Sequence, residues 1–145
     1  MPLPAVWGPK LWAVLHAVGA RAGMCSKAMA ADELRHSVWL LEHLETIVPC
    51  PECRAHIIGY RRSVPVPSAA SEIGQWIWQF HEAVNERLGK PAGPPFTRDL
   101  GRQTGLLESW KEYQRCIQES VLKGSVPGDA MREWNRRFQL WIACA

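Results

Sequence analysis

The sequence predicts an all-α protein, and three observations lead to that prediction. Apolar side chains recur at helical spacing along most of the 145 residues, and the alternation typical of strands is almost absent. Proline and glycine interrupt the apolar pattern between the helical segments. Hydrophobic residues make up 47% of the chain, which is enough for a core without a disulfide scaffold. We expect a helical bundle in residues 1–98 and a C-terminal helical hairpin in residues 99–145 that packs on the same domain.

Six helices are expected, each with a recognisable apolar stripe. Proline marks several of their ends: Pro9 suits a first turn, Pro49 breaks the second helix, and Pro51 suits the first turn of the third. Ser68 and Ser71 are candidate N-caps of the fourth helix. The expected extents are residues 9–23, 32–48, 50–62, 72–88, 107–121 and 131–141.

The composition limits the classes of function. The formal net charge is only +3, and basic residues are scattered among acidic ones, so nucleic acid is not an expected partner. No apolar run approaches the length that spans a bilayer, and no membrane partner is expected. Because no targeting segment is recognisable, we expect a cytoplasmic protein. Five cysteines cannot all pair within one chain.

Cys50 and Cys53 form a Cys-x-x-Cys pair at the expected start of the third helix. The N–H groups of a helix N-terminus stabilise a thiolate and lower the pKa of the thiol. The two sulfurs can also close a small ring, so the pair can cycle between dithiol and disulfide. A thioredoxin fold would need a preceding strand, and haem attachment would need a histidine where Arg54 stands. The pair is therefore a candidate redox-active centre.

Zinc is the main alternative for the same cysteines. Cys50, Cys53 and His56 could supply three ligands, with Cys25 or His43 as a fourth, in a zinc-stabilised interaction module. The Cys-x-x-Cys motif alone does not separate zinc binding from redox chemistry.

Two polar–aromatic helix faces add information. Trp12 and His16 lie one turn apart in the first helix, and His81 and Asn85 lie one turn apart in the fourth. Taken singly, each histidine is more often a satisfied, partly buried residue. Taken with a redox cysteine pair, the two faces predict a flat, polar ligand held between helices.

Three segments carry a resemblance to the Erv/ALR family of flavin-dependent sulfhydryl oxidases. They are Trp-Gly-Pro-Lys-Leu-Trp-Ala-Val-Leu-His at residues 7–16, Pro-Cys-Pro-Glu-Cys at residues 49–53, and His-Glu-Ala-Val-Asn-Glu-Arg-Leu-Gly-Lys-Pro at residues 81–91. Their order and spacing resemble those of the family across about the first 98 residues. The compact anatomy resembles the minimal members encoded by large DNA viruses.

The resemblance implies a four-helix bundle with a short fifth helix, non-covalently bound FAD and a homodimer. It implies that Cys50 exchanges with dithiols of protein substrates and that Cys53 faces the flavin, from which oxygen takes the electrons to give hydrogen peroxide. The implied cofactor-binding residues are Gly8, Lys10, Trp12, His16, His81, Asn85 and Lys90. A flavin-binding scaffold without oxidase turnover remains a second alternative.

The sequence departs from the family in three respects. A disulfide that typically clamps the loop after the fourth helix is missing, because its positions hold Trp78 and Thr97 or Arg98. We expect Trp78 to fill that volume. Glu82 replaces an asparagine of the third segment. The second cysteine pair that shuttles electrons in many members is also absent, and Cys144 and Cys116 are the candidate shuttle residues.

Overall fold

The computed structural model describes residues 3–97 and 105–144, and within them all regular structure is helical. The all-α class is therefore confirmed. The boundary expected at residues 98 and 99 lies outside the described residues. The helices are α1 (Pro4–Arg21), α2 (Ala30–Glu42), the 3-10 helix η1 (Leu44–Ile47), α3 (Pro51–Ser63), α4 (Ala70–Arg87), α5 (Leu106–Leu122) and α6 (Gly128–Ala143). The short fifth helix that the resemblance implies corresponds in order to α5, which has 17 residues.

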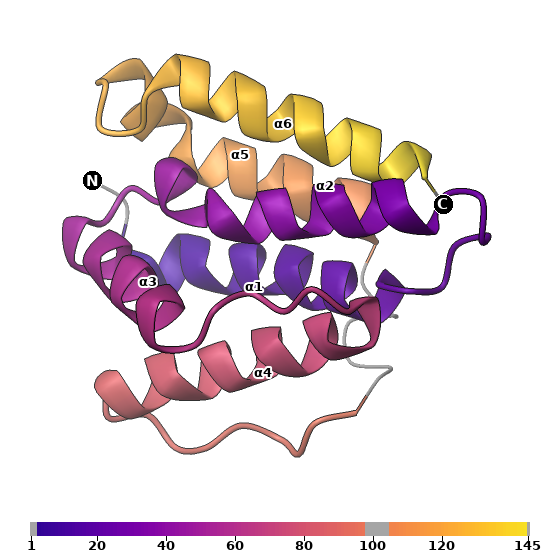
Figure 1. Ribbon diagram of the computed structural model, residues 1–145. Helices are drawn as coiled ribbons and strands as arrows, with labels where there is room; N and C mark the ends of the chain where they lie inside the picture. Colours follow the sequence, from indigo (N-terminus) through magenta and orange to yellow (C-terminus); the bar gives the residue numbers. More distant parts are fainter. Residues whose placement is uncertain (1–2, 98–104, 145) are drawn as a thin grey trace.

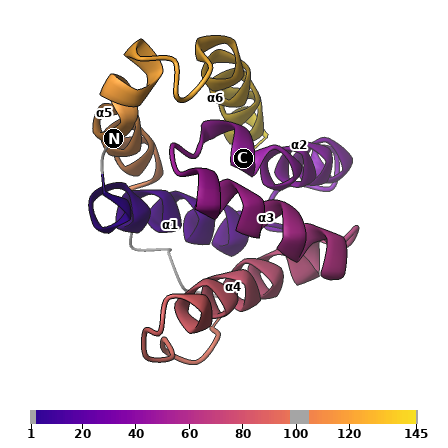
Figure 2. The same ribbon diagram turned by 90° about the vertical axis from the view of Figure 1, so that its left-hand side faces the viewer.

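Helix α1 lies at the centre of the molecule (Figures 1 and 2). It packs against α4 on one side and α5 on the other, while α2 packs against α6. The two C-terminal helices contribute large, fully buried side chains to the same core as the first four helices. These side chains are Trp110, Tyr113, Trp134, Phe138 and Trp141. Helices α5 and α6 thus complete the core around α1 and α2.

Two glycines let α1 and α4 approach closely. A Cβ atom built on Gly19 would lie 2.9 Å from the Cα atom of Gly74, a distance that real Cβ atoms essentially never show. The two helices therefore cross with backbone against backbone at this point. Further along the crossing, the same approach sets Trp12 of α1 against Phe80 and His81 of α4.

Some predicted helix ends were wrong. Helix α1 begins at Pro4, and Pro9 lies inside it. The extra turn forms because Trp7 is buried and packs edge-on against Tyr113 of α5, a partner that the sequence pattern did not reveal. Neither Ser68 nor Ser71 caps α4, whose N-cap is Ala69 without a side-chain hydrogen bond.

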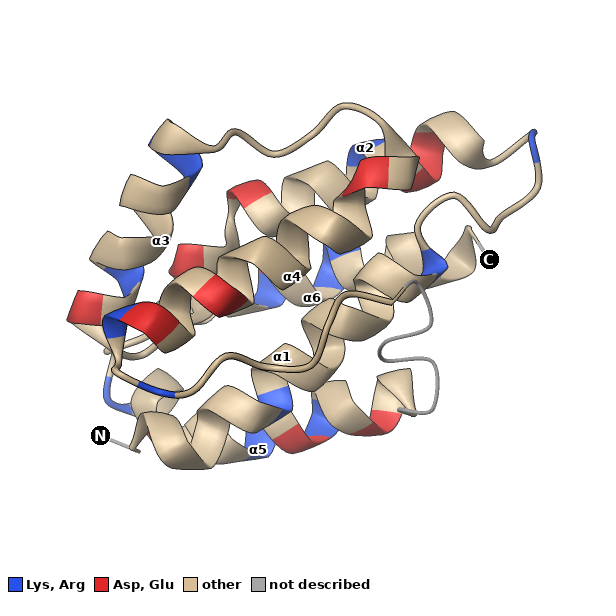
Figure 3. Ribbon diagram, turned by 90° about the horizontal axis from the view of Figure 1, so that it is seen from below, with Lys and Arg blue, Asp and Glu red and all other residues tan. Residues whose placement is uncertain are grey.

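Charged residues of both signs are interspersed over the helices, and along α5 they alternate (Figure 3). Within residues 3–97 and 105–144, no helix is both long enough and apolar enough to cross a membrane.

Candidate active site

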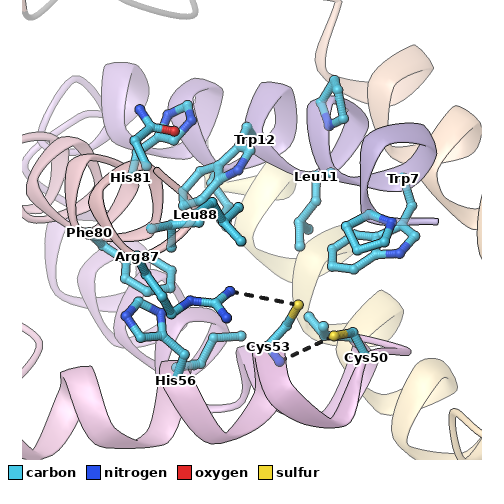
Figure 4. Close-up of a pocket in the computed structure, with 18 of the residues that line it drawn as sticks. Trp7, Leu11, Trp12, Cys50, Cys53, His56, Phe80, His81, Arg87 and Leu88 are labelled. Carbon is cyan, nitrogen blue, oxygen red and sulfur yellow. Dashed lines mark hydrogen bonds between the residues drawn. The ribbon is translucent and has the colours of Figure 1, made fainter. Parts of the chain in front are cut away.

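A cavity of about 600 Å³ opens between α1, α3 and α4 (Figure 4). This volume is typical of a small-molecule or cofactor site. The predicted site residues that line it are Gly8, Trp12, His16, Cys50, Cys53, His81, Asn85 and Lys90. The structure therefore brings together residues from all three segments that carry the family resemblance.

Cys50 is the N-cap of α3, as the sequence predicts, with Pro51 in the first turn. Its Sγ accepts a hydrogen bond from the backbone N–H of Cys53 at 3.2 Å. Both thiols are half-buried and line the cavity. The sulfur of Cys50 therefore lies at the N-terminus of α3, in contact with one of its backbone N–H groups.

Cys53 lies in a different electrostatic environment. The pKa of its thiol is raised to about 11, by burial first and then by the hydrogen bond and charge of the neighbouring Cys50. The guanidinium of Arg87 acts in the opposite direction. The lowered thiol pKa expected from the helix N-terminus is therefore wrong for Cys53, which keeps its proton at neutral pH while Cys50 is reduced.

Arg87 is a site residue that the sequence reasoning missed. Its Nη2 donates to the Sγ of Cys53 at 4.0 Å, from the end of α4 (Figure 4). The signal was present in the sequence, because Phe80, Val84 and Arg87 are spaced i, i+4 and i+7 along one helix face. All three side chains line the cavity, with Arg87 at the C-terminal end of the apolar stripe.

The two polar–aromatic faces meet on one wall of the cavity. The ring of Trp12 stacks on that of His81, with centroids 3.9 Å apart and planes 8° from parallel. His16 Nε2 and His81 Nδ1 lie 2.9 Å apart, so one ring donates a hydrogen bond to the other. Burial lowers the pKa of His16 to about 4 and also lowers the pKa of His81. At neutral pH this wall is therefore flat, aromatic and uncharged.

The cavity suits a planar, polar cofactor such as the flavin that the resemblance implies. Trp7 Nε1 and His56 Nδ1 are buried without a hydrogen-bond partner among the described residues, and both side chains line the cavity. Buried polar atoms of this kind normally have partners. The charged residues of the lining are Glu52, Arg87 and Lys90, so two of three can attract the pyrophosphate of a dinucleotide. The residues present fit FAD.

The zinc alternative finds no support in the geometry. Among residues 3–97 and 105–144, no three His, Cys, Asp or Glu side chains are placed to hold a metal ion. His56 stacks on Phe80, with ring centroids 6.0 Å apart. His43 stacks on Trp39, and the Nδ1 atom of His43 lies 2.8 Å from the backbone carbonyl oxygen of Trp39. Each histidine thus has its own packing partner in the fold.

The structure does not bring Lys10 to the cavity, in contrast to the other implied cofactor-binding residues. Its Nζ forms an ion pair with Glu112 of α5 at 2.7 Å. Two residues correspond to about 200° of rotation around a helix, so Lys10 faces away from Gly8. The sequence could not show this, because the packing of α5 on that side of α1 was unknown.

The loop after α4 is held without a disulfide. Trp78 Nε1 donates to the carbonyl oxygen of Pro94 at 2.9 Å, and Glu82 Oε1 accepts from the N–H of Gly93 at 2.9 Å. Phe96 lies beside the Trp78 ring, with centroids 6.2 Å apart. Trp78 thus contacts this loop from one of the two positions at which the family has its disulfide cysteines. Glu82, which replaces the family's asparagine, has a role that the sequence did not suggest.

Helix α5 and the turn between α5 and α6 hold the chain on both sides of Cys50. The hydroxyl of the fully buried Tyr113 donates to the carbonyl oxygen of Ile47 at 2.6 Å. Arg54 Nη2 donates to the carbonyl oxygen of Ser125, in the turn between α5 and α6, at 3.0 Å. Both bonds join elements far apart in the sequence, so periodicity gave no sign of them.

Neither candidate shuttle cysteine lines the cavity. Cys144 is buried at the end of α6, next to the C-terminal end of α1, where Arg21 lies over the Trp141 ring. Cys116 is half-buried on α5. The two cysteines therefore do not extend the Cys50–Cys53 pair within one chain.

Comparison with known proteins places these features in a family. The chain is 33% identical over 119 residues to the FAD-linked sulfhydryl oxidase of African swine fever virus (isolate Warthog/Namibia/Wart80/1980), covering 81% of this chain and 84% of the relative. It is 28% identical over 130 residues to sulfhydryl oxidase 1 of Oryza sativa subsp. japonica, covering 86% and 22%. It is 28% identical over 85 residues to the mitochondrial FAD-linked sulfhydryl oxidase ERV1 of Saccharomyces cerevisiae, covering 58% and 43%.

No solved structure matches the chain. The model of the Erv1 / Alr family matches residues 9–111, which include the cysteine pair, both polar–aromatic faces and the first turn of α5. The chain therefore belongs to the Erv1 / Alr family.

Proposed function

We propose that the protein is a FAD-linked thiol oxidase that forms disulfides in protein substrates. Electrons pass from a substrate dithiol to the Cys50–Cys53 pair, then to FAD and finally to oxygen, which is reduced to hydrogen peroxide. The observation that carries the proposal is that the Cys50–Cys53 pair and the Trp12–His81 stack line one cavity. The names of the relatives support both the activity and the cofactor.

The exchange with substrate begins from the oxidised Cys50–Cys53 pair. A substrate thiolate attacks the Sγ of Cys50, the bond between the two sulfurs breaks, and Cys53 leaves as a thiolate. The second substrate thiolate then attacks the substrate sulfur of the mixed disulfide and releases Cys50. The substrate loses two electrons and two protons, and the enzyme pair gains them as two thiols.

The reduced pair must then be oxidised again. Bound FAD would supply a two-electron acceptor beside Cys53. Trp12, His16, His81 and Asn85 would hold its ring system, and Lys90 would lie near its phosphates. The neutral state of the His16–His81 pair leaves ring nitrogens that can donate or accept a hydrogen bond without adding charge. Each turnover transfers two electrons and two protons to oxygen, which becomes hydrogen peroxide.

A homodimer is part of the proposal, as the family resemblance implies, and the size of the purified protein by light scattering tests it. The second candidate function, a flavin-binding scaffold, differs from the oxidase only in turnover. The same purified protein separates the two, because a scaffold is yellow but consumes no oxygen when a dithiol is added.

The test uses the purified protein, its visible absorbance and an oxygen electrode. The proposal predicts a yellow protein that consumes oxygen and produces hydrogen peroxide in equal amounts when dithiothreitol is added. Cys53→Ser should keep the flavin and lose the activity, whereas Cys116→Ser, outside the cavity, should keep both. A colourless protein that binds no added FAD would overturn the proposal.

A further inference from the structure

We propose that Arg87 is a catalytic residue that holds the sulfur of Cys53 as a thiolate during turnover. The inference rests on the proposed function and adds a residue to it. The family resemblance did not point to this position, and the contact between Arg87 and Cys53 was not expected from the sequence.

The geometry brings the guanidinium to the reacting sulfur. Arg87 Nη2 donates to the Sγ of Cys53 at 4.0 Å, and both side chains line the cavity. In Figure 4 the Arg87 side chain extends from α4 toward Cys53, and the Sγ of Cys53 is turned toward it. Among the charged side chains of the described residues that line the cavity, Arg87 is the one in contact with a sulfur of the pair.

Cys53 needs such a partner because its other neighbours disfavour a negative charge. Burial and the adjacent Cys50 raise the pKa of its thiol, and α1 presents the apolar Trp7 and Leu11 to the same cavity. The titratable groups around Cys53 are Cys50 and His56 from α3 and its N-cap, Arg87 from α4 and Tyr113 from α5.

None of the other titratable groups can replace Arg87. Tyr113 is uncharged, because burial raises the pKa of its phenol far above neutral. His56 is uncharged at neutral pH, because burial and then the charge of Arg87 lower its pKa. Among the described residues that line the cavity, Arg87 is therefore the cation in contact with this sulfur.

The thiolate of Cys53 occurs twice in each cycle. It is the leaving group when substrate opens the Cys50–Cys53 disulfide, and a leaving thiol with a lower pKa departs faster. It is then the electron donor beside the flavin, where the proton must be absent before the sulfur can react. A guanidinium at this distance favours the deprotonated sulfur in both steps without taking up or releasing a proton itself.

The test measures the protonation of Cys53 directly in the flavin-loaded protein. In a Cys50→Ser background, a Cys53 thiolate beside oxidised flavin gives a long-wavelength absorbance band, and its pH titration reports the pKa of Cys53. Arg87→Met should move the midpoint upward by about one pH unit, and Arg87→Lys should move it by less. Arg62→Met, an exposed arginine of α3 outside the cavity lining, is the matched control and should leave the midpoint in place.

A second readout separates this role from simple cofactor binding. If Arg87→Met weakens FAD binding, measured by flavin fluorescence, but leaves the midpoint unchanged, Arg87 is a cofactor anchor and the inference is wrong. An unchanged midpoint with unchanged FAD binding also overturns it. If Arg87→Met does not fold, Arg87→Gln, which also removes the charge, takes its place in the same comparison. Failure of the proposed function is distinct, since the unmutated protein would then be colourless or inactive.

Discussion

Cysteines lie beside an arginine at both ends of α1, but the surroundings of these cysteines differ. At the N-terminal end, Cys50 caps a helix N-terminus and Cys53 accepts a hydrogen bond from Arg87. At the C-terminal end, Cys144 caps the C-terminus of α6, and its Sγ donates to the carbonyl oxygen of Leu140 at 3.4 Å. A helix N-terminus favours a thiolate and a C-terminus disfavours one.

The causes of the raised pKa values show the same contrast. Burial is the largest cause for both Cys53 and Cys144. The next cause at Cys53 is Cys50, whose sulfur is its disulfide partner in the proposed cycle. At Cys144 the next causes are the carboxylates of Asp32 and Glu33, which offer no redox partner. A raised thiol pKa therefore does not by itself mark a cysteine as inert, because the identity of the neighbour decides what the thiol can do.

The largest effect is expected when the sulfur of Cys53 is removed. Cys53→Ser should lower thiol oxidation by roughly 1,000-fold or more, since the substituted pair can no longer form its disulfide. Oxygen consumption with dithiothreitol measures the loss, and the flavin absorbance shows that the cofactor is still bound. Appreciable turnover in this variant would mean that another cysteine carries the electrons.

The histidine pair predicts a pH dependence at the cavity end of α1. The pKa of His16 is lowered from its ordinary value to about 4, so the folded protein binds its proton less readily than the unfolded chain does. Stability should therefore be complete above about pH 6.5 and should fall as the pH decreases toward 4, by on the order of 2–3 kcal/mol.

Urea unfolding at several pH values measures this loss. His16→Asn keeps a polar side chain that does not titrate, and it should flatten the decrease. If His16→Asn and the parent protein lose stability equally between pH 6.5 and 4, the loss has another source.

A smaller effect is expected from the contact between α5 and the segment before Cys50. Tyr113→Phe keeps the ring in the core but leaves the carbonyl oxygen of Ile47 without its hydrogen bond. Unfolding should require about 1–2 kcal/mol less free energy, measured by urea denaturation. Tyr60→Phe is a suitable control, because its half-buried ring packs against Trp76 and Phe80 and no hydrogen bond of its hydroxyl is described. Equal losses in the two variants would argue against the specific bond.

The smallest effect should come from the other end of α1. Cys144→Ser should leave the rate of dithiothreitol oxidation within about twofold of the parent, because Cys144 does not line the cavity. The same variant can be assayed with a reduced, unfolded protein as substrate. A rate that falls only with the protein substrate would identify Cys144 as a shuttle, acting outside its own chain.

Sequence patterns were sufficient for features determined within one helix. The cap of α3 at Cys50 and the shared faces of Trp12 with His16 and of His81 with Asn85 follow from helical spacing. Contacts between elements far apart in the sequence were not predictable in this way. The ion pair of Lys10 with Glu112 depends on where α5 packs, and the same packing extends α1 back to Pro4.

Arg87, at the end of α4, was predictable from the sequence only in part. The position of Arg87 on the cavity face follows from its spacing to Phe80 and Val84. Its contact with Cys53 depends on how α3 and α4 lie across the cavity, which only the structure shows. Likewise, Trp78 was expected to fill the place of the missing disulfide, but the hydrogen bond of Glu82 to Gly93 was not.

The most direct test of the redox centre at Cys50 and Cys53 is anaerobic reduction of the bound flavin by dithiothreitol, followed by its visible absorbance. The account predicts that the absorbance is lost in the parent protein and in Cys144→Ser, returns when air is admitted, and persists in Cys53→Ser. Equally fast loss of the absorbance in Cys53→Ser would contradict it.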